Sequence, residues 1–154
     1  MTVESEKIEA RVEAFEEACR REGLRRTPQR LAIFREVARS EGHPSAEEIY
    51  ERVRRKLPTM SRDTVYRTLR LLQQKDLVST VGTLHERVRF DPNTDRHHHF
   101  ICTRCGEVRD FYSGELDAYE PPEEVRRWGR IESMQAELRG TCSECLRGEE
   151  TASA

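Results

Sequence analysis

The sequence predicts an α+β protein in which a helical N-terminal half precedes a smaller half with short strands and a metal site. Apolar residues recur at helical spacing through the first half of the chain. Short runs of alternating apolar residues follow, which is the pattern of strands. Two Cys-x-x-Cys pairs lie in the second half, and paired cysteines at this spacing are typical of zinc sites: Cys102 with Cys105, and Cys142 with Cys145.

Four helices are expected in the first half. The first covers residues 5–22, where Ile8, Val12, Phe15 and Cys19 share one face and Gly23 follows as a stop signal. Each of the next three begins at a side chain that can accept a hydrogen bond from the first helical turn: Thr27, Ser45 and Ser61.

A β-hairpin is expected after the fourth helix, from runs around residues 77–81 and 86–90 joined through Gly82. Helices followed by such a hairpin form a winged helix-turn-helix, whose second helix places its early residues against base edges in the major groove. The helix that begins at Ser61 is the candidate. Taken alone, it could be an ordinary charged surface helix.

Charge distribution favours the nucleic-acid interpretation. The net charge of the chain is −2, but basic residues outnumber acidic ones by about two to one between residues 18 and 75, whereas acidic residues dominate after residue 83. A locally basic surface of this kind suits a polyanion such as DNA. We therefore expect residues 1–90 to form a winged-helix DNA-binding domain.

The second domain is expected to cover residues 91–147 and to be followed by a disordered tail at residues 148–154, which are polar. Its strands are predicted at residues 107–112 and 131–138, with a short helix that ends near Trp128. A unit this small has little room for an apolar core, so a zinc ion bound by its cysteines would stabilise its fold by linking distant parts of the chain.

The four paired cysteines admit other interpretations. A Cys-x-x-Cys can be a redox dithiol, and cysteines can be ordinary buried thiols. A redox dithiol does not need a second copy, so two matched pairs favour a closed structural zinc site. The fifth cysteine, Cys19, falls on the apolar face of the first helix and is expected to be a buried free thiol.

Histidines and aspartates form a second candidate set. His97 and His99 are spaced to lie on the same side of an extended strand. Asp91 and Asp110 are near them in sequence, and His43 lies at the break before Pro44. Nitrogen and oxygen donors together favour Fe²⁺ or Mn²⁺. Exposed histidines and a turn aspartate are the ordinary alternatives.

From about Phe15 to Cys145 the sequence resembles the ferric uptake regulator family. The resemblance is carried by the segments GLRRTPQR, HPSAEEIY, SRDTVYRTL, RFDPNTDRHHHFICTRCGEVRDF and CSEC. It implies a cytoplasmic, homodimeric, metal-dependent transcription factor with an N-terminal winged helix-turn-helix and a zinc-stapled α/β dimerisation domain.

The resemblance also assigns residues. The structural zinc would be held by Cys102, Cys105, Cys142 and Cys145. The regulatory Fe²⁺ or Mn²⁺ would be held by His43, Asp91, His97, His99 and Asp110. Contacts to double-stranded promoter DNA would come from Arg25, Ser61, Arg62, Thr64, Tyr66 and Arg67. A further metal site of some relatives is not expected, because residues 128–138 contain no histidine.

Two acidic ligands that are both aspartate, Asp91 and Asp110, place the resemblance closest to the peroxide-sensing branch. There, iron-catalysed oxidation of histidine ligands releases the repressor, and His43 and His97 would be the sensitive residues. An iron or manganese uptake regulator without peroxide sensing is the alternative.

Other classes fit the sequence less well. A metallohydrolase would need a general base beside the His/Asp set, and none is evident. A bare zinc-stapled interaction module would leave the basic helix unexplained. No apolar stretch has the length of a membrane span and no signal-peptide pattern is present, so we expect no membrane partner. Free thiols and a thiolate metal site suit the reducing cytoplasm. We therefore expect a cytoplasmic regulator that is not an enzyme and has no small organic substrate.

Overall fold

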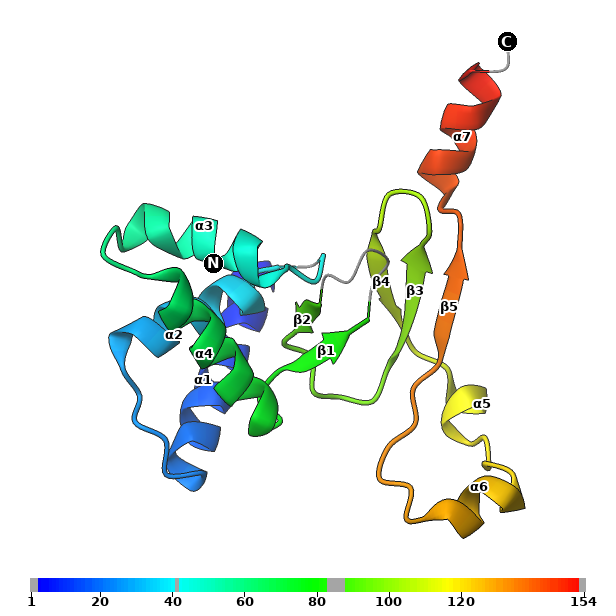
Figure 1. Cartoon of the computed structure of the whole chain (residues 1–154), viewed down its shortest axis with the longest axis horizontal. Coiled ribbons are helices and arrows are strands. Elements are labelled where there is room, and N and C mark those ends of the chain that lie inside the picture. Colours follow the sequence, from blue (N-terminus) through cyan, green and yellow to red (C-terminus); the bar gives the residue numbers. More distant parts are fainter. Residues whose placement is uncertain (1–2, 41, 83–87, 153–154) are drawn as a thin grey trace. The chain divides into compact units, whose positions relative to one another are not determined.

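The computed structural model describes residues 3–40, 42–82 and 88–152 (Figure 1). The chain divides into two compact units, Met1–Thr94 (unit 1) and Asp95–Ala154 (unit 2). The expected boundary after residue 90 lies slightly earlier than this division. The difference arises because Asp91 pairs with Ser79 in a ladder that belongs to unit 1.

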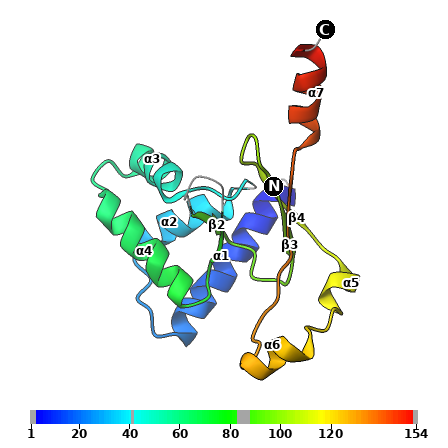
Figure 2. The same ribbon diagram turned by 45° about the vertical axis from the view of Figure 1, so that its right-hand side comes forward.

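The described part of unit 1 contains four helices, and α2 packs against the other three (Figures 1 and 2). Their bounds are Val3–Arg21 for α1, Pro28–Ala38 for α2, Ala46–Lys56 for α3 and Arg62–Gln74 for α4. Side chains from all four form one core. Ile33, Ile49 and Leu69 are fully buried, and Phe15 of α1 stacks on Phe34 of α2 with ring centroids 4.2 Å apart. Burying such a side chain contributes about 1.5–3 kcal/mol, so packing holds the helices together.

The predicted caps are present. The side-chain oxygens of the three cap residues accept a backbone N–H from the first turn of their helices, at 3.2 Å for Thr27, 3.3 Å for Ser45 and 3.1 Å for Ser61. At α3 the capping box is complete, because the backbone N–H of Ser45 also donates to Glu48 Oε2 at 2.7 Å.

The end of α4 differs from the sequence expectation, which begins a strand at Leu77. Asp76 has a φ of 54°, in the left-handed region, and the N–H of Leu77 donates back to the carbonyl of Leu72 at 2.9 Å. The N–H of Asp76 donates to Gln73 O at 3.0 Å. This pair of hydrogen bonds is a Schellman motif. Leu77 therefore completes the helix end, and the strand begins later.

The wing consists of β1 (Ser79–Val81) and β2 (Arg89–Asp91), which pair antiparallel. Residues 83–87, which include part of the second predicted strand, lie outside the described residues. Strand β2 also reaches the loop before α3, because the N–H of Phe90 donates to Pro44 O at 3.0 Å. The order of helices followed by a two-stranded ladder is that of a winged helix-turn-helix.

Unit 2 is built on a three-stranded sheet in the order β4-β3-β5 (Figure 1). Its strands are β3 (His98–Cys102), β4 (Val108–Phe111) and β5 (Glu137–Gly140). Strand β3 pairs antiparallel with β4 and parallel with β5. The short helices α5 (Gly114–Asp117) and α6 (Glu123–Trp128) lie in the connection between β4 and β5.

One expectation for unit 2 is wrong in its bounds. The strand predicted at residues 131–138 lies later, at Glu137–Gly140, because its limits are set by pairing with β3 and not by its own alternation. The sequence analysis expects a disordered tail from residue 148, and the structure describes α7 over Ser143–Ala152. The helix starts at the second cysteine pair, where Leu146 N–H donates to Cys142 O at 3.0 Å. Residues 153–154 lie outside the described residues.

Among the described residues, no helix combines the length and apolar character needed to cross a bilayer.

The capping box at α3 yields a stability prediction. Replacing Ser45→Ala removes the oxygen that accepts the Glu48 N–H, so we expect the free energy of unfolding to fall by about 1 kcal/mol. Urea denaturation of the full chain followed by circular dichroism measures this loss. Ser45→Thr is the matched control, since it keeps a hydroxyl oxygen and should retain most of the stability. Equal losses in the two variants would show that the hydrogen bond is not the source.

Candidate functional site

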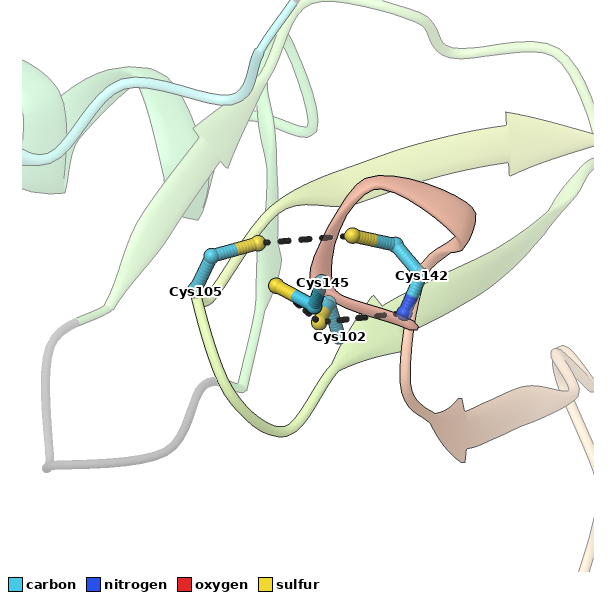
Figure 3. Close-up of side chains that lie close together, drawn as sticks. All are labelled: Cys102, Cys105, Cys142 and Cys145. Atoms are coloured by element: carbon cyan, nitrogen blue, oxygen red, sulfur yellow. Dashed lines mark hydrogen bonds between the residues drawn. The ribbon is translucent and has the colours of Figure 1, made fainter. Parts of the chain in front are cut away.

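The first cysteine pair lies on a tight turn at the end of β3 (Figure 3). Cys102 is the last residue of the strand, and the N–H of Gly106 donates back to its carbonyl at 3.0 Å. Gly106 has a φ of 75°, a left-handed conformation that glycine adopts without the penalty of a Cβ atom. The turn directs the thiols of Cys102 and Cys105 towards the second pair.

Strand pairing brings the second cysteine pair to the first. The parallel register places Cys102 opposite Gly140, so the chain leaves β5 beside the turn and enters α7 there. The N–H of Cys142 donates to Cys102 Sγ at 3.3 Å. Sulfur–sulfur distances are 3.9 Å between Cys102 and Cys145 and 3.8 Å between Cys105 and Cys142 (Figure 3). All four sulfur atoms lie within 4.8 Å of one another.

These distances fit a tetrahedral metal site. A tetrahedron with zinc–sulfur bonds of about 2.3 Å has edges of about 3.8 Å, which is close to the two sulfur–sulfur distances above. All five cysteines are free thiols, so the cluster is not a pair of disulfides. Four protein ligands complete the coordination of a tetrahedral ion, which makes the cluster suited to a structural role and leaves no position for a substrate.

Hydrogen bonds give the cysteine thiols of the cluster different pKa values. Backbone N–H groups of Cys105 and Cys142 lower the pKa of Cys102 to about 6. The thiol of Cys142 and the burial of the cluster raise the pKa of Cys145 to about 12. The same cluster therefore lowers the pKa of one thiol, Cys102, and raises the pKa of two others, Cys105 and Cys145. A divalent cation would reverse that balance by stabilising all four anions together.

A second group of ligand-type side chains lies on one face of the unit 2 sheet. The antiparallel register pairs His99 of β3 with Asp110 of β4, and His97 is two residues before His99, on the same face. The Nε2 atoms of the two histidines are 3.0 Å apart. Asp110 Oδ1 lies 3.7 Å from His97 Nε2 and 3.5 Å from His99 Nε2. Two nitrogens and one oxygen thus converge, as predicted from the sequence.

The tautomer of His97 suits a ligand. Its Nδ1 lies 2.6 Å from the backbone carbonyl oxygen of Asp95, which can only accept a hydrogen bond. In the neutral ring the proton is therefore on Nδ1, which leaves the lone pair on Nε2, the atom that faces His99 and Asp110. Histidines that bind metals commonly donate their other ring N–H to a carbonyl in this way.

In unit 1, His43 and Asp91 form a buried pair. The Nε2 of His43 lies 3.3 Å from Asp91 Oδ2, and both residues are almost fully buried. His43 has a φ of 50°, and Arg89 Nη1 holds its carbonyl oxygen at 3.1 Å. Asp91 also accepts the N–H of Asn93 at 2.8 Å. A loop and a strand of unit 1 therefore supply one imidazole and one carboxylate at the same point.

All the candidate DNA-contacting residues except Arg25 lie at the start of α4. Ser61 caps the helix, and its Oγ is 2.8 Å from Thr64 Oγ1. The side chain of Tyr66 is half exposed, although it belongs to an amphipathic helix with a buried face. Arg67 is also exposed and forms an ion pair of 3.3 Å with Asp63 one turn earlier. An exposed pair of this kind contributes little stability, so Arg67 can exchange Asp63 for another partner.

The side chain of Arg62 contacts two residues of α3, which the sequence did not predict. Its guanidinium donates to both carboxylate oxygens of Glu47, at 2.9 and 3.0 Å, and lies 4.9 Å from the ring centroid of Tyr50. Glu47 and Tyr50 were not identified from the sequence, since nothing local relates α3 to Arg62. The last candidate, Arg25, lies before α2, and its carbonyl accepts a hydrogen bond from Arg30 at 2.7 Å.

His98 is another residue that the sequence analysis did not single out. Its side chain is fully buried, its Nδ1 accepts the N–H of Ala136 at 3.1 Å, and its Nε2 lies 3.4 Å from Asp117 Oδ1. Alternation along β3 was the available signal, because it predicts that His98 faces away from His97 and His99. On that opposite face, the contacts of His98 with Ala136 and Asp117 hold β3 in place.

Comparison with known proteins agrees with this architecture. Residues 21–138 match the model of the ferric uptake regulator family. A peroxide-responsive repressor, PerR, from Staphylococcus epidermidis is 35% identical over 145 residues, which cover 94% of this chain and 97% of the relative.

Solved structures of the same family are also similar. The ferric uptake regulator of Helicobacter pylori, described as having three functional metal-binding sites, superposes with a TM-score of 0.72 at 27% identity and covers 90% of this chain and 93% of its own. The peroxide stress regulator of Campylobacter jejuni has a TM-score of 0.66 at 28% identity, with coverage of 77% and 89%. The winged helix-turn-helix, the four-thiol cluster and the family match lead to one conclusion: the chain belongs to the ferric uptake regulator family.

Proposed function

We propose that this chain is a metal-dependent DNA-binding repressor that senses peroxide through iron-catalysed oxidation of its own histidine ligands. The observation that carries the proposal is the presence of two chemically distinct groups of ligands: four thiolates suited to zinc, and nitrogen and oxygen donors suited to iron or manganese. The first group has the closed geometry of a structural site, so the second group is the one available for sensing.

In this proposal the four cysteines hold a structural zinc ion that maintains unit 2 and the homodimer. Support comes from the sulfur–sulfur distances of 3.8 and 3.9 Å. It also comes from the scarcity of apolar core in unit 2. Its buried apolar residues, among those the structure describes, are Ile101, Val108 and two of the cysteines. Structural zinc sites commonly contribute most of the folding free energy of such small units.

The regulatory ion would be Fe²⁺ or Mn²⁺, with His43, Asp91, His97, His99 and Asp110 as ligands. Each of the two groups converges within its own unit, and their sharing of one ion is part of the proposal. An ion that needs ligands from both units would bind best to the arrangement that brings them together. Metal binding and DNA binding would then be coupled because both favour the same arrangement.

The DNA-binding surface would be the start of α4 with its flanking arginines. Tyr66 and Arg67 would contact base edges, because both are exposed on the early turns of the helix. Ser61, Arg62, Thr64 and Arg25 would contact the phosphate backbone. Two subunits of a dimer would address two half-sites on promoter DNA.

Peroxide sensing is favoured over plain metal-uptake regulation by two observations. Both acidic ligands are aspartate, Asp91 and Asp110, and the curated relative at 35% identity is a peroxide-responsive repressor. No cysteine is well placed to react with peroxide instead, since four belong to the metal cluster and Cys19 is buried, with a pKa that burial raises.

We place the protein in the cytoplasm, because the five free thiols of the chain suit a reducing compartment.

The metallohydrolase alternative is not favoured, because the family to which the chain belongs consists of regulators. The His/Asp groups are explained by metal sensing, and the basic winged helix by DNA binding, so no residue of either set is left to support hydrolysis.

Zinc dependence is tested by Cys142→Ser. Loss of one thiolate opens the cluster, so we expect bound zinc and the dimer to be lost together. Metal analysis of the purified chain and analytical ultracentrifugation measure the two. The control is Cys19→Ser, which removes a thiol outside the cluster and should leave the zinc content unchanged. A zinc-free Cys142→Ser dimer would rule out this role for the metal.

Base recognition is tested by Arg67→Ala. If Arg67 makes a bidentate contact to guanine, its removal should weaken binding to the operator by about 1–3 kcal/mol and relax its sequence preference. The comparison is Arg25→Ala, which should weaken binding to every DNA sequence alike and reduce the salt dependence. Gel-shift or anisotropy titrations on specific and scrambled duplexes at several salt concentrations separate the two effects. An unchanged preference in Arg67→Ala would show that another residue reads the bases.

Peroxide sensing is tested by comparing metals. With Fe²⁺ bound, mild peroxide should add one oxygen atom to His43 or His97 and release the DNA, whereas Mn²⁺ should support DNA binding without oxidation. Peptide mass spectrometry and gel shifts on the same samples measure both results. His43→Ala should lose metal-dependent DNA binding even without peroxide. An equal response with both metals would leave the chain a plain metal sensor, our alternative function.

A further inference from the structure

Tyr112 lies on the same face of the sheet as the predicted ligands of unit 2. In the β3–β4 ladder, His99 pairs with Asp110 and His98 pairs with Phe111. Continuing this antiparallel register by one step places Tyr112 across from His97, and residues two apart share a face. The ring geometry agrees, because the ring centroids of His97 and Tyr112 are 6.1 Å apart.

The polar end of this face thus holds His99 across from Asp110 and His97 across from Tyr112, beyond the apolar pair of Ile101 and Val108. The pairs differ in exposure. The ring of His97 is fully buried, whereas Tyr112 is 65% exposed. Its phenol therefore lies between solvent and a ligand, within ring-contact range of that ligand.

We propose that Tyr112 is a second oxidation site of the peroxide response, and that it competes with His97 for the oxidant. The inference rests on the proposed function, since the oxidant must be produced by iron held at His97, His99 and Asp110. In the net reaction, the phenol ring exchanges one C–H for a C–OH at the position ortho to its hydroxyl. One H₂O₂ is consumed and one H₂O is released, so the tyrosine becomes a catechol and the peroxide is reduced.

The chemistry favours this ring for a physical reason. An oxidant formed from peroxide at iron is so reactive that it attacks what it meets first, so distance decides its target. Phenol rings are electron-rich and accept oxygen at least as readily as imidazole. Phe111, the neighbouring ring, belongs to the opposite face, where it contacts His98 with ring centroids 5.3 Å apart. Tyr112, the residue directly after β4, therefore has the aromatic ring that is placed to be oxidised.

Tyr119 provides an internal control of similar chemistry and exposure. It is 55% exposed, compared with 65% for Tyr112, but it lies after α5 and not on the ligand face. An oxidant that diffuses through solvent would modify the two rings to a similar extent. An oxidant formed at the ligand face would modify Tyr112 alone.

Both tyrosines fall in one tryptic peptide, DFYSGELDAYEPPEEVR, which begins after Arg109. Fragment ions can therefore compare the two sites without any difference in peptide recovery. The dimeric, zinc-loaded chain is treated with limiting H₂O₂ after loading with Fe²⁺, with Mn²⁺ or with neither. We expect added oxygen on Tyr112 to exceed that on Tyr119 several-fold with iron, and the excess to vanish with manganese. Equal oxidation of the two rings would overturn the proposal.

Two variants complete the test. His99→Ala removes a ligand and should abolish the excess on Tyr112. Tyr112→Leu removes the competing ring at an exposed position, where the fold should tolerate it, and should raise the fraction of His97 that gains oxygen at limiting peroxide. An unchanged yield on His97 would overturn the competition. The peptide HHHFICTR, which begins after Arg96, reports this yield.

The outcomes separate the two levels of inference. Oxygen on His43 or His97 without an excess on Tyr112 would overturn the assignment of Tyr112 alone and leave the proposed peroxide sensing intact. No iron-dependent oxygen on any of these residues would overturn both.

Discussion

The parallel pairing of β3 with β5 is the constraint on which unit 2 depends. It places Cys102 opposite Gly140 and thereby brings two cysteine pairs that are distant in sequence to within sulfur–sulfur distances of 3.8 and 3.9 Å. Parallel neighbours need a long crossover connection, and here the connection contains α5 and α6. Closing so long a loop costs conformational entropy, which a tightly bound metal would offset.

The two units differ in what stabilises them. Unit 1 has a continuous core drawn from four helices, with residues such as Ile33, Ile49 and Leu69 fully buried. Helices α2, α3 and α4 have side-chain N-caps, and β1 pairs with β2, so core packing and local hydrogen bonds hold unit 1 together. In unit 2, Ile101 and Val108 are the buried aliphatic residues among those described. Metal binding by the cysteine cluster would therefore affect the folding stability of unit 2 far more than that of unit 1.

Strand β3 separates two kinds of chemistry by alternation. His97 and His99 face Asp110, where a redox-active ion would sit, while His98 points to the opposite face and connects the strand to Ala136 and its neighbours. The three consecutive histidines thus face two different surroundings, because successive side chains of a strand point to opposite faces. The same alternation places the phenol ring of Tyr112 beside His97. An oxidant made at this face would therefore meet two rings, and only oxidation of His97 would damage a proposed ligand.

The sequence by itself determined what local rules govern: the caps at Thr27, Ser45 and Ser61, the order of helices and wing, and the two kinds of ligand chemistry. These follow from hydrogen bonds and periodicities that span a few residues. The tertiary structure alone decided where β5 begins, how α4 ends, that α7 continues to Ala152, that Arg62 is held from α3, and which nitrogen of His97 carries the proton. Each of these depends on a partner that the chain brings near only when it folds, and sequence spacing does not specify such partners.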